Sequence, residues 1–208
     1  DGRLSPITSG LHRLLLVAPS DTRVTPVALI YDFMTTHRLR LFVDLAPPIE
    51  QATMFTSHEL NAQLRVHWLR NMRFSATQLA SGLLMRLRDQ PGTQTITRAE
   101  LTTGVGRWAA RLAAAGRHVD ERLLRPASLR RVVGGYLRYA ERHSILRRVG
   151  RDRWTLADTL PELAVPLGDV GYDQAPLAYA LNELHELLSV GATVATEVEP
   201  AAQLGGCG

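Results

Sequence analysis

The sequence predicts an α/β segment of one helix and two strands over residues 1–55, followed by a mostly α-helical extension over residues 56–190. Two apolar runs of strand length, at residues 24–31 and 39–45, predict the first part, because a stretch with helical spacing precedes them. Three Ser/Thr-x-x-Glu/Gln spacings after residue 55 predict the second, because each marks a helix start. Residues 191–208 are expected to form a disordered tail.

The α/β segment has the pattern of part of a larger domain. Its helix is expected after Ser9 and Gly10, with an inward apolar stripe of Leu11, Leu14, Leu15 and Ala18. Residues 24–31 are almost continuously apolar and contain Pro26, which favours a buried parallel strand with an irregular start. Pro47 and Pro48 close the second strand. Because two strands rarely form a stable sheet alone, we expect the other strands upstream of Asp1.

The extension shows local signals for helices and one hairpin. Capping boxes at Thr56–Glu59, Ser75–Gln78 and Thr97–Glu100 predict three helices, and residues 126–143 predict another with one apolar face. Residues 146–149 and 153–156 flank a Gly-Arg-Asp turn and predict a β-hairpin. A helix start, a helix and then a hairpin is the element order of a winged helix. Residues 176–190 predict a last amphipathic helix.

Composition limits the classes of function. With 208 residues, 45% of them hydrophobic, the chain can bury a substantial core. No apolar run approaches the roughly 18 residues of a membrane span, and the first residues lack a signal-peptide pattern. The single cysteine, Cys207, excludes an internal disulfide and fits a reducing cytoplasm. All 24 basic residues are arginine, which we attribute to GC-rich coding, and the net charge of +4 suits an anionic membrane, substrate or nucleic acid.

Four short segments occur in order near the start: DGRL at 1–4, SGL at 9–11, TPVALIYD at 25–32 and LFVDLAPPI at 41–49. Together they resemble the later part of the catalytic domain of the glycerolipid acyltransferase family, whose members acylate glycerol-3-phosphate or 1-acyl-glycerol-3-phosphate. In that family a Pro-Glu-Gly phosphate-binding motif precedes a polar loop, a helix, and a strand with a Val-Pro-Val-like motif. The earlier motifs would lie before residue 1.

The resemblance implies specific roles for a few residues. Val24, Thr25, Pro26, Val27 and Ala28 would help line the acyl-donor or acceptor pocket. Arg3 would lie near the anionic substrate. The acyl donor would be acyl-CoA or acyl-carrier protein, and no cofactor is implied. The parent enzyme would act in phospholipid biosynthesis, peripheral to the cytoplasmic face of the cell membrane.

The catalytic base of that family is missing from this chain. The family uses a His with an Asp at the fifth following position, and that pair takes the proton from the acceptor hydroxyl. None of the seven histidines has Asp at that position. We therefore expect no catalytic residue here, and no acyl transfer by this portion of the protein alone.

An alternative interpretation makes the extension a winged-helix DNA-binding or interaction module. Its helix would then present arginines 130, 131, 138 and 142 to phosphates or base edges, and the hairpin would add arginines 147, 148, 151 and 153. A third interpretation has the arginines and the three tryptophans contact anionic lipid. His118 and Asp120 are interpreted as a solvated loop, and no metal site is expected.

Overall fold

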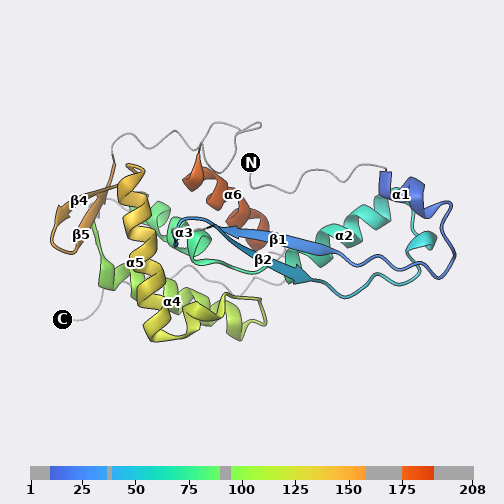
Figure 1. Cartoon of the computed structure of the whole chain (residues 1–208), viewed down its shortest axis with the longest axis horizontal. Coiled ribbons are helices and arrows are strands. Elements are labelled where there is room, and N and C mark those ends of the chain that lie inside the picture. Colours follow the sequence, from blue (N-terminus) through green and yellow to red (C-terminus); the bar gives the residue numbers. More distant parts are fainter. Residues whose placement is uncertain (1–9, 37–38, 90–94, 158–174, 190–208) are drawn as a thin grey trace.

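The computed structural model describes residues 10–36, 39–89, 95–157 and 175–189 (Figure 1). In these ranges the fold is mixed α/β, with six α-helices and two small antiparallel sheets, which confirms the predicted class at this level. The elements are α1 (Gly10–Leu15), β1 (Val27–Asp32), β2 (Arg40–Leu45), α2 (Ser57–Asn71), α3 (Ala76–Arg88), β3 (Thr95–Thr97), α4 (Arg98–Ala114), α5 (Pro126–Arg142), β4 (Leu146–Gly150), β5 (Arg153–Leu156) and α6 (Pro176–Ser189). Short 3₁₀ turns cover Ala52–Met54 and Glu121–Leu124. The expected tail, residues 191–208, lies outside the described ranges.

Strands β1 and β2 form a two-stranded antiparallel ribbon that runs from the helices toward α1 (Figure 1). Val27 is opposite Leu45, and Asp32 is opposite Arg40. The prediction of a buried parallel strand at residues 24–31 is therefore wrong. Only seven residues separate the two strands, too few for the crossover that parallel pairing needs, and side chains of β1 alternate between exposed and buried.

Helix α1 lies at the far end of the ribbon and is shorter than the apolar spacing suggested. It ends at Leu15, which is buried in a small cluster with Ile49 and with Leu60 and Leu64 of α2. Leu14 is 68% exposed, so the predicted inward stripe is wrong at that position. With six residues, the helix is too short to keep a full stripe against one neighbour.

The predicted helix starts are confirmed at all three capping boxes. Thr56 with Glu59, and Thr97 with Glu100, form both reciprocal hydrogen bonds of the motif. The backbone N–H of Ser75 likewise donates to Gln78 Oε1 at 2.8 Å just before α3. Each box satisfies backbone donors that have no partner within the helix, so these boundaries follow from residues three positions apart.

The second sheet has three antiparallel strands in the order β3-β5-β4. The β4–β5 hairpin is the predicted one, with a bulge between Arg148 and Gly150. Strand β3 was not predicted, and it enters α4 directly at Thr97. The chain order is therefore α3, β3, α4, α5, β4 and β5, with the first strand paired to the last.

A single large core joins the ribbon to the helices. Ile30 of β1 and Phe33 and Met34 after it pack with buried residues of α3, α4, α5 and α6. Phe33 contacts Tyr139 of α5 and Tyr179 of α6 edge-on, with ring centroids 6.3 and 5.9 Å away. The inner face of the ribbon is thus held by helices far along the chain, of which α6 (Pro176–Ser189) is the most distant.

Candidate functional site

The outer face of the ribbon is apolar and exposed. Cross-strand pairs on this face are Val27 with Leu45, Leu29 with Val43, and Tyr31 with Leu41. The exposed fractions are 42% for Val27, 49% for Leu29, 46% for Leu41, 56% for Val43 and 68% for Leu45. Contiguous apolar patches of this kind mark interaction surfaces on folded proteins. This face is therefore the first candidate site.

The inner face of the ribbon carries a buried carboxylate that links three elements. Asp32, fully buried at the end of β1, accepts hydrogen bonds from Thr77 of α3 at 2.7 Å and from Arg122 at 2.6 Å. Thr35 donates to the same carboxylate. Arg122 also donates to the buried Asp120, with Nε 2.8 Å from Oδ2. One guanidinium thus lies between two buried carboxylates.

The electrostatics of Arg122 follow from this placement. Burial alone would lower the pKa of Arg122, but its hydrogen bonds to Asp120 and Asp32 outweigh burial and raise that pKa. Both oxygens of Asp32 are occupied by donors from the protein. Asp32 is also fully buried, so a substrate proton cannot reach its carboxylate. The cluster positions β1 on the helices and is not a catalytic centre.

A second ion pair fastens the other strand. Asp44 of β2 is buried and receives Arg73 Nη2 at 2.8 Å. The guanidiniums of Arg73 and Arg122 lie 5.1 and 5.8 Å from the centre of the Phe42 ring. The inner face therefore has one buried carboxylate on each strand among apolar residues such as Ile30 and Phe42, whereas the outer face is apolar along its length.

The residues expected to bind substrate lie at the entry to β1. Val24 forms a backbone bridge with Ile49 and is half-buried, and Thr25 is exposed. Pro26 is buried, and its carbonyl accepts the N–H of Ala46 at 2.9 Å. Val27 lies on the outer face, but Ala28 faces the core. Side chains of a strand alternate between faces, so these five do not share one surface. Arg3 lies outside the described residues.

The exposed face of α5 is basic. Its exposed arginines are Arg130, Arg131, Arg138 and Arg142. The opposite face is buried and includes Leu129, Val133, Tyr136 and Ala140. The β4–β5 hairpin next to the C-terminal end of α5 exposes Arg147, Arg148, Arg151 and Arg153. This surface is the second candidate site.

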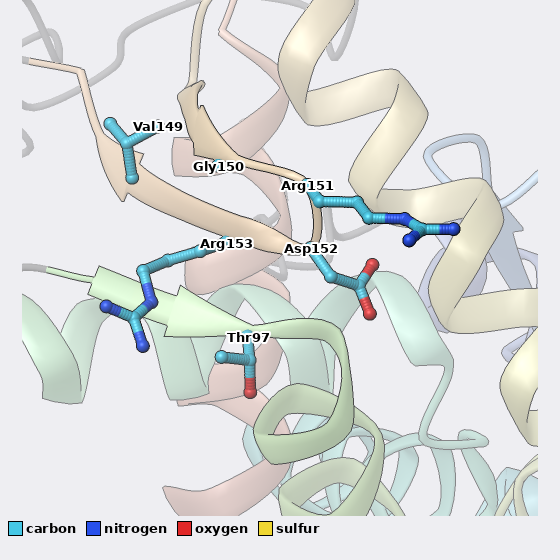
Figure 2. A pocket seen from close by; sticks show the side chains of 6 residues that line it. All are labelled: Thr97, Val149, Gly150, Arg151, Asp152 and Arg153. Carbon is cyan, nitrogen blue, oxygen red and sulfur yellow. The ribbon is translucent and has the colours of Figure 1, made fainter.

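The hairpin turn borders a shallow hollow lined by Thr97 and residues 149–153 (Figure 2). Arg151 and Arg153 leave the turn in opposite directions, so their side chains do not converge on one point. Asp152 is paired with Arg98 at 3.3 Å. Without converging polar groups the hollow lacks the arrangement typical of a small-molecule site.

Buried polar groups between α3, α5 and α6 are paired with one another. Glu183 of α6 accepts a hydrogen bond from Gln78 at 2.9 Å, and burial raises the pKa of Glu183 to about 7. The hydroxyls of Ser81 and Tyr136 lie 3.0 Å apart, and burial raises the pKa of Tyr136. These pairs connect packed helices.

The loop with His118 and Asp120 does not form a joint site. His118 is exposed, whereas Asp120 is buried and bound to Arg122, so the solvated loop predicted here is wrong for Asp120. Within the described ranges, no cluster of three or more His, Cys, Asp or Glu side chains is arranged to hold a metal ion. Nor does any helix in those ranges combine the length and hydropathy needed to cross a bilayer.

Comparison of the chain with protein-family models, curated proteins and solved structures finds no match.

Proposed function

We propose that this chain is the C-terminal portion of a phospholipid-biosynthesis acyltransferase, which transfers a fatty acyl group from acyl-CoA or acyl-carrier protein to a glycerol-phosphate acceptor. The observation that carries the proposal is the ribbon with one face in the core and an apolar, exposed outer face. That ribbon is formed by the same residues that resemble the acyltransferase family. The parent enzyme would lie at the cytoplasmic face of the cell membrane.

The outer face argues that the ribbon belongs to a larger layered sheet. A two-stranded ribbon is marginally stable in water, and apolar residues on both faces are typical of strands that have a layer on each side. The helices cover the inner face. An additional layer on Val27, Leu29 and Val43 would complete an α/β sandwich, and an antiparallel pair at the edge of such a sheet is common. A position at the edge of a larger sheet agrees with the resemblance, which assigns these strands to the later part of the catalytic domain.

The division of chemical labour follows from what this chain contains. The His–Asp pair and the phosphate-binding motif would come from the preceding part of the enzyme, where the base removes the proton of the acceptor hydroxyl as it attacks the thioester carbonyl. This chain would contribute residues that line the substrate pocket. Thr25 has an exposed side chain at the strand entry, outside the proposed covering layer, and is the predicted binding residue best placed to touch a substrate.

The helical part has the order expected of a winged helix. Three helices, α3, α4 and α5, are followed by the β4–β5 hairpin, and β3 pairs with β5 to complete a three-stranded sheet. These features support the proposal that residues from α3 to β5 are a winged-helix module packed against the acyltransferase domain. Such modules also serve as interaction surfaces, so the fold alone does not assign an activity.

The proposal is tested by expressing the chain joined to its upstream coding sequence. We expect acyl transfer to glycerol-3-phosphate or to 1-acyl-glycerol-3-phosphate, and none from the 208 residues alone. Absence of a His-x4-Asp motif and a Pro-Glu-Gly motif upstream of Asp1 would refute the assignment. So would failure of the longer protein to acylate either acceptor.

A pair of variants tests the role of the outer face separately. Leu29→Ser with Val43→Ser should destabilise the longer protein, because both residues would be buried there, but should leave the stability of the isolated chain nearly unchanged. Val149→Ser is the matched control, since Val149 is 49% exposed in the hairpin, away from the ribbon. Equal effects of the double variant on both proteins would count against a covering layer.

A further inference from the structure

The net positive charge of the chain is concentrated in one segment. Residues 126–156, which form α5 and the β4–β5 hairpin, contain eight arginines and two acidic residues, a balance of +6. The remainder of the chain has the other 16 of the 24 arginines and 18 of the 20 acidic residues, a balance of −2. If arginine were merely the default solvated residue, acidic partners would accompany it here as they do elsewhere. The excess is a property of this segment.

Helix α5 arranges part of this charge as a stripe. Arg131, Arg138 and Arg142 are seven and four positions apart, so they lie along one face of the helix, and Arg130 borders that face. All four side chains are exposed, and none of the ion pairs found within the described ranges involves them. Their charge is therefore directed to solvent.

Two glycines, Gly134 and Gly135, lie between Arg131 and Arg138 in place of bulky side chains. Gly134 lies between Arg131 and Arg138, and a Cβ added there would lie 3.7 Å from Nη1 of Arg138. The Arg138 guanidinium thus folds back over a position that has no side chain. The Arg138 guanidinium therefore stays close to the helix, which suits a broad anionic surface better than a deep pocket.

The segment that follows β1 packs on α5 at Gly135, which lies four positions after Arg131 and three before Arg138 on the same side of the helix. A Cβ added at Gly135 would lie 1.9 Å from the carbonyl oxygen of Thr35, so the two backbones are in direct contact. An α-helix with its side chains is about 10–12 Å across, close to the roughly 12 Å width of the DNA major groove. With a second chain segment packed between two of its arginines, α5 together with that segment is too thick to enter the groove.

The aromatic side chains of this segment also disfavour single-stranded nucleic acid. Tyr136 and Trp154 are buried in the core, and Tyr139 is half-buried and stacks on His143 at 4.0 Å. Proteins that bind single strands stack bases on exposed aromatic rings. Val149, at the bulge of the hairpin and flanked by Arg147, Arg148 and Arg151, instead offers an exposed apolar contact among cations.

We propose that the exposed face of α5, with Arg130, Arg131, Arg138 and Arg142, together with the β4–β5 hairpin, binds the anionic phospholipid surface of a membrane. The inference rests on the proposed function, because it assigns to this face the attachment of the enzyme to the membrane that holds its substrate and product. Each arginine near an anionic bilayer contributes about fivefold to partitioning at ordinary salt, so three contribute roughly 100-fold.

The test measures sedimentation of the 208-residue chain with vesicles of phosphatidylcholine mixed with phosphatidylglycerol, and with vesicles of phosphatidylcholine alone. The chain should bind only the mixed vesicles, and more weakly as salt rises. The variant R131Q/R138Q/R142Q should lose roughly 100-fold in affinity. The matched control is R70Q/R107Q/R111Q, which removes the same charge from exposed positions on α2 and α4. It should bind nearly as the unmodified chain does.

Three results would overturn the proposal: no binding to mixed vesicles, equal loss in the two triple variants, or tighter binding to a short DNA duplex than to the vesicles. Unchanged thermal unfolding of both triple variants verifies that they fold. The proposed function fails separately. Vesicle binding by a longer protein that acylates neither acceptor would refute the enzyme assignment and leave the surface standing, whereas acyl transfer without vesicle binding would refute the surface alone.

Discussion

Two neighbouring glycines of α5 test how closely the segment after β1 packs on this helix. A Cβ at Gly135 would lie 1.9 Å from the carbonyl oxygen and 2.8 Å from the carbonyl carbon of Thr35. At Gly134 the nearest atom is Nη1 of Arg138, at 3.7 Å, at the end of a flexible side chain. Gly135→Ala and Gly134→Ala are therefore the same chemical change. At Gly135 the new methyl group overlaps backbone atoms, whereas at Gly134 it makes an ordinary van der Waals contact.

The two substitutions should have opposite effects on stability. Alanine in a helix interior is favoured over glycine by about 0.5–1 kcal/mol, so Gly134→Ala should raise the free energy of unfolding by that amount. At Gly135 the same gain is outweighed, because 1.9 Å is about half of the roughly 3.5–4 Å at which heavy atoms pack. The Thr35 backbone must move, and overpacking of this kind costs about 1–3 kcal/mol.

Urea unfolding followed by circular dichroism measures both effects. We expect the midpoint of Gly134→Ala to rise and that of Gly135→Ala to fall. The gain from alanine is common to both variants, so they should differ by the overpacking cost, about 1–3 kcal/mol. The corresponding thermal midpoints should differ by several degrees, since about 2–4 °C accompanies each kcal/mol in a protein of this size. Equal midpoints for the two variants would refute the close approach of Thr35, and with it the argument that α5 is too thick for a DNA groove.

Two further variants probe the buried ionisable groups. Arg122→Leu should lower the free energy of unfolding by about 3–5 kcal/mol, because it leaves the carboxylates of Asp32 and Asp120 buried without their cation; a loss below about 1 kcal/mol in chemical denaturation would contradict this. Glu183→Gln should stabilise the protein by up to about 3 kcal/mol above pH 7 and have little effect below about pH 4.5. The folded pKa of Glu183, about 7, lies above its unfolded value of roughly 4.3. The stability that the bound proton confers is therefore complete at low pH and is lost as the pH rises through 7. Glutamine can still accept the hydrogen bond from Gln78, and a gain that does not grow between pH 5 and pH 8 would argue against a protonated Glu183.

Local elements were predictable because their signals lie within a few residues. The boxes at Thr56 and Thr97 each depend on a Glu three positions later, and the structure contains both reciprocal pairs. The hairpin around residues 150–152 is similarly local. Strand β3 was missed because three residues are too short for a periodic pattern, and it exists only by pairing with β5, more than 50 residues later.

The candidate sites depended on contacts that no local pattern contains. The continuous apolar run at residues 27–31 correctly indicates two apolar faces, but it does not reveal which strand pairs with it or in which direction. Asp32 and Arg122 are 90 positions apart, and neither is distinctive in the sequence. The arginines of α5 were visible, but their exposure as one stripe became clear only when the helix was placed against the core.

The core shared by ribbon and helices limits how the protein can be divided for experiments. A truncated protein that begins at residue 57 would lose Ile30, Phe33 and Met34 from the large core and would leave Arg122 with one carboxylate in place of two. Proteolytic cleavage between residues 46 and 56 would, for the same reason, nick the chain without releasing an independently folded fragment. Experiments on helices α3 to α6 therefore need the ribbon to be retained. Activity that is lost when the protein is shortened from its N-terminal side would first indicate a loss of folding, and only then a loss of binding.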